Sequence, residues 1–289
     1  MAKEKKGETL LGAHISGAGS LHRALEIGKE LGCNTIQIFT RSNRQWSFNL
    51  IDEGEVVLFL ETKKKTGLTS VVSHASYLIT LGSPKRATHA NSVRALRAEL
   101  RRCEQLELPY LVLHPGARLD SPMETCLKKI SAGLSEVLED VPGSCMILLE
   151  TMAGQGSTVG ATFEELAVIR DQVADKKRVG FCFDTCHAFA AGYSFTSSED
   201  YQACFKEVDR ILGLIHLKAF HLNDSVKGLG SHVDRHEWIG KGKIGISAFS
   251  HLMNDPRFID HPKIIETPLS TYRDHVRNLQ VLRNLIGAT

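Results

Sequence analysis

Histidine and carboxylate side chains recur at similar places along the chain, each at the end of a short apolar run. These residues are His74, His114, Glu150, Asp184, His221 and Glu266. Imidazole nitrogens and carboxylate oxygens are ligands that zinc, manganese and iron accept in proteins. A single buried histidine is more often a hydrogen-bonded structural residue. The interpretation therefore depends on whether the fold brings the six residues together.

Three more residues of the same types lie in the second half of the chain. His187 follows Asp184 by three residues, and the segment "HVDRHEW" holds Asp234 and His236 two residues apart. An Asp-x-His pair with a third histidine can form another three-ligand site that leaves positions open for water or substrate. Taken alone, "DRH" in a loop is usually solvated charge.

The apolar runs predict the strands that must position these residues. They span 10–16, 35–40, 70–75, 110–116, 146–151, 179–185, 219–224 and 263–267. Their nearly continuous apolar character is typical of a parallel sheet that is buried on both faces. Amphipathic helical segments separate them, and one begins near Pro122 with Asp120 and Ser121 as candidate N-caps.

Eight strand and helix units in 289 residues, with no Pro-rich or Gly-rich linker, predict a single-domain α/β fold, the (β/α)8 TIM barrel. A doubly wound open sheet is the alternative. A barrel would aim all six strand-end residues into one mouth, where like charges would crowd unless a cation compensated them. Six residues exceed the ligand set of one tetrahedral ion. The sequence therefore predicts at least two metal ions.

The stretch "GFCFDTCHAFAAG" also contains two cysteines, Cys182 and Cys186. Cys186 is next to His187, but neighbouring side chains at a strand end point apart, and a nucleophilic cysteine needs an adjacent base. We interpret both cysteines as packing residues. All seven cysteines of the chain are expected to be reduced thiols, as in a cytoplasmic protein.

Two segments after predicted strands suit contact with nucleic acid. The loop "RSNRQWSFN" contains Arg41, Arg44, Gln45 and Trp46. Basic, amide and aromatic groups together can bind a nucleic-acid backbone and unstacked bases. Tyr77 and Leu78 follow His74, where an apolar side chain can act as a wedge in DNA. Packing at a helix start is the alternative for these residues.

Composition limits the classes of function. The formal net charge of +2 excludes a strongly basic tail protein but allows a local basic groove. The polar extension 1–9 lacks the apolar core of a secretory signal, and no run in the barrel domain, 10–289, is long enough to cross a membrane. "GAGS" and "GLGS" lack the context of a phosphate-binding loop, so no nucleotide cofactor is expected.

Over nearly its whole length the chain closely resembles the endonuclease IV family of apurinic/apyrimidinic endonucleases, zinc-dependent DNA repair enzymes on a TIM barrel. The resemblance rests on "GAHIS", "FTRSNRQW", "HASYLI", "LHPG", "ETMAGQGS", "FDTCHAFAAGY", "FHLNDS", "VDRH" and "IIET". "DTCHAFAAGY" and "VDRH" are highly specific. Met152 in "ETMAGQGS" departs from the family's motif.

The resemblance implies three zinc ions per chain. It assigns the first zinc to His74, His114 and Glu150, the second to Glu150, Asp184, His221 and Glu266, and the third to His187, Asp234 and His236. Glu150 would bridge two ions and act as the catalytic residue. The residues that penetrate and bend the duplex would be Arg44, Gln45, Tyr77 and Leu78.

The implied reaction is cleavage of the phosphodiester bond 5′ to an abasic site in double-stranded DNA, as in base excision repair. It would leave a 3′-hydroxyl and a 5′-deoxyribose phosphate, and a monomer would suffice. An abasic nucleotide resists extrusion from the duplex less than an intact one. Zinc lowers the pKa of bound water to about 7 and so supplies a nucleophile at neutral pH.

Two other classes of function stay open on the sequence. A sugar isomerase or epimerase on the same barrel would use one or two ions, with Glu150 and Glu266 moving a proton. Such an enzyme has no obvious need for His187, Asp234 and His236. A non-catalytic DNA-binding scaffold would bind lesions without needing the full set of ligand residues.

Overall fold

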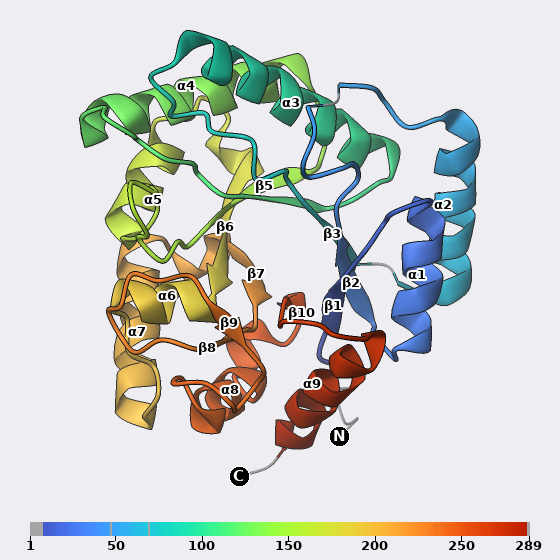
Figure 1. Cartoon of the computed structure of the whole chain (residues 1–289), viewed down its shortest axis with the longest axis vertical. Helices are drawn as coiled ribbons and strands as arrows, with labels where there is room; N and C mark the ends of the chain where they lie inside the picture. The colour runs from blue at the N-terminus through green and yellow to red at the C-terminus, as the bar shows by residue number, and fades with distance from the viewer. Residues whose placement is uncertain (1–7, 47, 69, 288–289) are drawn as a thin grey trace, which may run out of the picture.

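The computed structural model describes residues 8–46, 48–68 and 70–287, and it contains the predicted barrel. Parallel strands close on themselves in the order β1-β10-β7-β6-β5-β4-β3-β2 (Figure 1). The strands are β1 (Leu11–Ile15), β2 (Thr35–Ile38), β3 (Ser70–His74), β4 (Tyr110–Leu113), β5 (Met146–Glu150), β6 (Val179–Asp184), β7 (Leu217–His221) and β10 (Lys263–Ile265). Each overlaps a predicted run, so the TIM barrel is confirmed and the open sheet is not. Residues 1–7 of the predicted polar extension lie outside the described residues.

Helices surround the strands (Figure 1). They are α1 (Leu21–Glu30), α2 (Glu53–Thr66), α3 (Arg86–Gln105), α4 (Met123–Asp140), α5 (Phe163–Asp171), α7 (Ser198–Ile211), α8 (Ile246–Met253) and α9 (Tyr272–Leu285). The short helix α6 (Thr185–Ala191) follows β6 directly, and β8 (Asp224–Ser225) pairs antiparallel with β9 (His236–Glu237) outside the barrel. Short 3-10 turns occupy Lys176–Arg178, Leu214–His216 and Pro256–Phe258.

The helix α4 illustrates why the intervening segments are helical. Its buried residues include Cys126, Ile130, Leu134 and Val137, whose spacing of three and four places them on one face. Burial of each leucine or isoleucine side chain contributes roughly 1.5–3 kcal/mol. That face packs against the barrel, and the alternation of apolar runs with such helices produces the closed architecture.

The start of α4 differs from the expectation. The prediction of Asp120 or Ser121 as the N-cap is wrong, because Pro122 itself occupies that position and no side chain caps the helix. The carbonyl of Pro122 accepts a hydrogen bond from the amide of Cys126. Pro122 has a non-helical ψ of 142°, so the first helical residue is Met123 and the N-cap lies one residue later than Ser121.

Side chains at the ends of β3 to β7 point into the interior of the barrel. A small apolar cluster of Val72, Val112, Leu148, Cys182 and Ala219 takes one residue from each of β3 to β7 and is separate from the larger core between strands and helices. Side chains alternate along a strand, so the residue two positions later also points inward. These later residues are His74, His114, Glu150, Asp184 and His221. The predicted packing role of Cys182 is confirmed.

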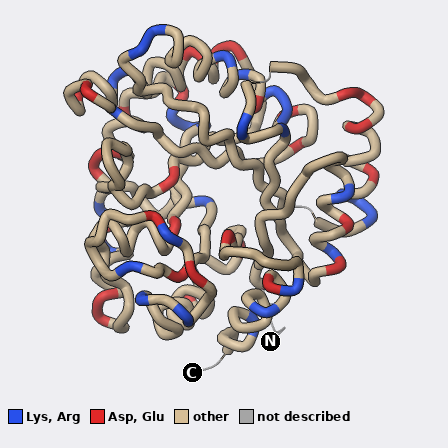
Figure 2. Tube along the Cα trace, in the orientation of Figure 1, with Lys and Arg blue, Asp and Glu red and all other residues tan. Residues whose placement is uncertain are grey.

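Charge of both signs is spread over the outer helices, where Lys and Arg alternate with Asp and Glu (Figure 2). This distribution agrees with the formal net charge of +2. Among the residues that the structure describes, no helix combines the length and the apolar character needed to cross a membrane.

Candidate metal centre

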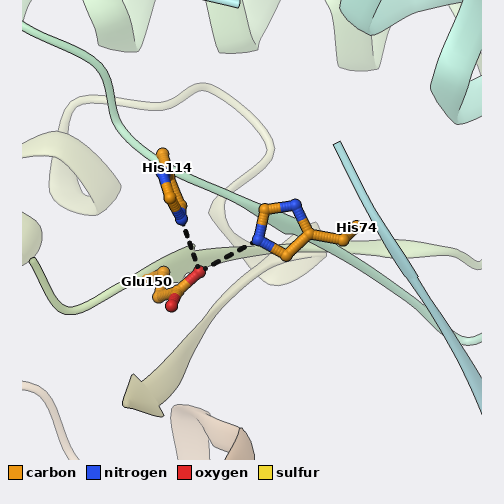
Figure 3. A group of neighbouring side chains, drawn as sticks. All are labelled: His74, His114 and Glu150. Carbon is orange, nitrogen blue, oxygen red and sulfur yellow. Dashed lines mark hydrogen bonds and ion pairs between the residues drawn. The ribbon is translucent and has the colours of Figure 1, made fainter. Parts of the chain in front are cut away.

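The first group of candidate ligands joins the ends of β3, β4 and β5. The Nε2 atoms of His74 and His114 lie 3.2 and 3.1 Å from Oε2 of Glu150. Figure 3 shows both imidazoles directed at this one carboxylate oxygen. Two donors bound to a tetrahedral zinc ion at 2.0–2.2 Å lie about 3.4 Å apart. The three side chains are therefore spaced as ligands of one ion would be.

The second group uses the other oxygen of Glu150. Nδ1 of His221 lies 3.0 Å from Oε1 of Glu150 and 3.3 Å from Oε2 of Glu266. Oδ2 of Asp184 lies 3.9 Å from the same nitrogen. One ligand atom from each of these four residues lies within 4.8 Å of the others. Because its two oxygens face two separate groups, Glu150 has the geometry of a bridging ligand.

The third group is His187, Asp234 and His236. Nε2 of His187 lies 3.2 Å from Oδ2 of Asp234, and Nε2 of His236 lies 3.4 Å from Oδ1. The two Nε2 atoms are 3.5 Å apart. Asp234 lies on a loop, as the sequence predicts, whereas His236 begins the two-residue strand β9. All nine predicted ligand residues are thus brought into three groups with the predicted membership.

The start of α6 separates Asp184 from His187. The carboxylate of Asp184 caps the helix by accepting a 2.7 Å hydrogen bond from the backbone N–H of His187. His187 lies in the first turn of the helix and points its Nε2 at Asp234. The two residues therefore belong to different groups, although they are three apart in sequence.

A thiol also lies near the third group. One ligand atom of each of Asp184, Cys186 and His236 lies within 4.8 Å of the others. Burial, followed by the charge of Asp184, raises the pKa of the Cys186 thiol to about 12. Cys186 is completely buried and forms no disulfide. These properties agree with the interpretation of Cys186 as a packing residue.

Protons balance the charges of the groups. Burial opposes the ionised form of Glu150, but the positive charges of His221 and His114 outweigh it and hold the pKa well below its usual range. Burial likewise opposes the charged form of His187, yet Asp184 and other carboxylates raise its pKa well above the ordinary value. An ionised Glu150 therefore lies beside protonated His187 and His221, both of whose pKa values are raised although burial opposes the charge. A metal ion would replace those protons, so its binding would be coupled to proton release.

A pocket of about 610 Å³ opens beside these groups. Its lining includes Tyr77, His114, His187, Asp234 and Glu266. The ring of Tyr77 packs at centroid distances of 5.4 Å from His74 and 5.2 Å from His114. The Tyr77 side chain is half exposed, so a molecule entering the pocket would contact it.

The predicted nucleic-acid residues divide into exposed and structural ones. Arg44 and Gln45 are exposed on the loop after β2, and Leu78 is partly buried. The expectation that Arg41 contacts nucleic acid is wrong. Its guanidinium is buried against the carboxylate of Glu99, with an Nη2 to Oε1 distance of 2.6 Å. An arginine held by a buried carboxylate positions the loop instead.

Comparisons with known proteins decide the family. The chain matches the family described as xylose isomerase-like TIM barrel over residues 25–285. A protein of Geobacter sulfurreducens named probable endonuclease 4 is 46% identical over 278 residues, which cover 96% of this chain and 94% of the relative. A protein of the same name from Chloroflexus aurantiacus is 46% identical over 277 residues, with 95% and 97% covered. The chain belongs to the endonuclease IV family.

Solved structures agree with this assignment. Endonuclease IV from Thermus thermophilus superposes with a TM-score of 0.85 at 36% identity, covering 96% of this chain and 99% of that one. A D-tagatose 3-epimerase-like protein superposes with a TM-score of 0.70 at 23% identity, covering 95% of this chain and 96% of that one. The second likeness shows the barrel alone. The sugar-epimerase alternative therefore gains nothing from it beyond the fold.

Two polar residues near the metal groups of this endonuclease IV family member were not predicted from its sequence. His14 on β1 places Nδ1 3.0 Å from Oε1 of Glu266. Gln37 on β2 donates from Nε2 to the same oxygen at 2.8 Å. They follow Gly12 and Thr35 by two residues, which is the spacing of the candidate ligands on the other strands. That spacing predicts that both side chains point into the barrel. Gln37 was not predicted as a site residue because glutamine is not a common metal ligand.

Proposed function

We propose that this chain is a zinc-dependent endonuclease that cleaves duplex DNA on the 5′ side of abasic sites. The observation that carries the proposal is the division of the two Glu150 oxygens between separate donor groups, with a third group beside them. Relatives named probable endonuclease 4, which match 96% and 95% of this chain, support the same activity. Three zinc ions per chain is the corresponding expectation.

The donor sets fit zinc. Each group offers only imidazole nitrogens and carboxylate oxygens, and the first and third have three protein ligands, which leaves a position for water or substrate. When bound, the ions would supply Lewis-acid catalysis and a water of lowered pKa. Every ligand residue comes from a single chain, so a monomer would contain the complete centre.

The chain's own residues would bind and orient the DNA. The pocket beside the groups is within the usual size range of small-molecule sites, and an abasic sugar-phosphate has no base to accommodate. Tyr77 and Leu78 would pack against the distorted duplex next to the lesion. Arg44 and Gln45 would contact it from the exposed loop after β2. Glu150 would remain ionised between the first and second groups.

A duplex oligonucleotide with one tetrahydrofuran abasic analogue tests this function. Metal-replete protein should cleave the strand 5′ to the analogue, and the upstream fragment should be extended directly by a DNA polymerase because it ends in a 3′-hydroxyl. The matched duplex without the analogue and protein treated with chelator are the controls. An intact abasic strand after incubation with metal-replete protein would refute the proposal.

The same preparation separates the alternatives. A sugar epimerase would convert a ketose and hold one or two ions per chain, which metal quantification would reveal. A binding scaffold would retain the lesion duplex without cleaving it.

For the loop residues, Arg44→Ala should weaken duplex binding roughly tenfold and lower its salt dependence, as loss of a phosphate contact does. Unchanged binding would remove Arg44 from the interface.

A further inference from the structure

The candidate histidine ligands are oriented in two different ways. His74, His187 and His236 each direct Nδ1 at a backbone carbonyl, those of Ala75, Thr151 and Glu266, at 2.7, 2.9 and 3.1 Å. A carbonyl only accepts hydrogen bonds, so Nδ1 carries the proton in each case. A metal binds the neutral ring, in which Nε2 is then the atom with a free lone pair, and this atom faces the metal group.

His221 is oriented the opposite way. Its Nδ1 faces Glu150 and Glu266, while its Nε2 lies 2.8 Å from Oε1 of Gln37. The partner that selects the protonated nitrogen is therefore a side chain. Every residue type supplies a backbone carbonyl, but the orientation of His221 depends on the presence of this glutamine.

The carboxamide of Gln37 is itself held in one orientation. Its Nε2 donates to Oε1 of Glu266 at 2.8 Å, and a carboxylate can only accept. The amide oxygen must therefore face His221, where it accepts the Nε2 proton. Gln37 is fully buried, and it reaches from β2 to Glu266, which follows β10, and to His221 at the end of β7. Neither of these strands pairs with β2 in the barrel.

The hydrogen bond from Gln37 gives the two carboxylate oxygens of Glu266 different surroundings. Oε1 accepts from Gln37 and lies 3.0 Å from Nδ1 of His14, whereas Oε2 lies 3.3 Å from Nδ1 of His221. One oxygen is engaged in hydrogen bonds and the other faces the group. A ligand with one oxygen held in this way can offer only the second to an ion.

We propose that Gln37 is a positioning residue for the second metal group. Its carboxamide keeps Nδ1 of His221 and Oε2 of Glu266 directed at one ion. The inference rests on the metal binding of the proposed function and adds a residue that is not itself a ligand. Loss of such a partner typically weakens metal binding 10–100-fold.

The test compares Gln37→Met with Thr35→Val in the full-length chain. Methionine has a similar length but no hydrogen-bonding group. Thr35 is the matched control, because it is buried on the same strand and its hydroxyl donates to the carbonyl of Ser70, far from any ligand. Zinc affinity would be measured for each ion by competition with a chromophoric chelator, and zinc content by native mass spectrometry.

We expect Gln37→Met to bind one ion 10–100-fold more weakly and to retain the ion of the third group. Thr35→Val should keep wild-type affinity for every ion, even if it lowers the free energy of unfolding. In zinc-loaded protein, the hydrogen-bonded Nε2 proton of His221 should give a protected NMR resonance that Gln37→Met lacks.

Wild-type affinity for all ions in folded Gln37→Met would overturn the inference, as would equal weakening by Thr35→Val. Neither result depends on DNA cleavage. A wild-type chain that binds zinc but leaves abasic DNA intact would refute the proposed function, while the affinity of Gln37→Met would still decide the role of Gln37. A wild-type chain that binds no zinc would overturn both.

Discussion

The first two ligand groups and the third group use the same residue types but are supported differently. Glu150, Asp184 and His221 end barrel strands and are completely buried. Asp234 is 40% exposed and lies on a loop between two short strands. The strands β5, β6 and β7 that carry these residues each pair with a parallel strand on both sides. The backbone N–H of Asp234 instead donates to the side chain of Gln155 on a loop. Because the ligand types are the same but the backbone support differs, we expect the third group to bind its ion more weakly than the first two groups bind theirs.

The largest effect is expected where the first two groups meet. Glu150→Gln keeps the size of the side chain but removes the charge that both groups share. Cleavage of the abasic duplex in single turnover should fall by at least about 1000-fold, because neither ion would keep its bridging carboxylate.

Binding of the same duplex should persist in Glu150→Gln, since no predicted DNA-contacting residue is altered. Circular dichroism would verify that the variant is folded. Turnover near the wild-type value would contradict the bridging role of Glu150.

A second prediction tests whether Asp184 and His187, which are three residues apart in sequence, bind different ions. Asp184→Asn should lose the ion of the second group, and His187→Ala should lose that of the third, each lowering cleavage on the order of 100-fold. Asparagine preserves the acceptor that caps α6, so the helix itself is not disturbed. Native mass spectrometry would count the ions. Loss of the same ion from both variants would show that the groups are not independent.

A third prediction concerns the order of metal release. The third group should yield its ion to a chelator first, at a rate roughly tenfold above the others, because exposure of Asp234 lets solvent and chelator approach. Release would be followed with a chromophoric chelator. His187→Ala should lack the fast phase, and a single common rate in the wild-type protein would remove the distinction between exposed and buried groups.

The smallest effect is expected from the thiol beside the third group. Cys186→Ala should leave zinc content unchanged and cleavage within about threefold of wild type, since the buried thiol has a pKa of about 12 and stays protonated. Native protein should also resist alkylation at Cys186 near neutral pH. Loss of one ion from Cys186→Ala would make the cysteine a ligand and change the composition of the third group.

Local regularities made much of this structure predictable. The apolar runs located the strands because each must be buried on both faces, and the ligand types at their ends followed from reading the residues themselves. The N-cap of α4 was predicted wrongly because proline is common as the first helical residue, whereas Pro122 here has a non-helical ψ of 142° and is itself the N-cap.

Partners distant in sequence were not predictable. Arg41 was expected at the nucleic-acid interface because a loop arginine is usually exposed. Its partner, Glu99, lies 58 residues away on α3, and only the packing of that helix brings the two together. Gln37 went unnoticed for a related reason, since His221 is 184 residues distant.

The sequence by itself determined the barrel and the residues able to bind metal, because the alternation of side chains along a strand and the burial of apolar runs are local properties. The tertiary structure decided which of those residues lie in the same group. Asp184 and His187, three residues apart, fall into different groups because α6 begins between them. Glu150 and His221, 71 residues apart, lie 3.0 Å from each other because closure of the barrel brings their strand ends to one mouth.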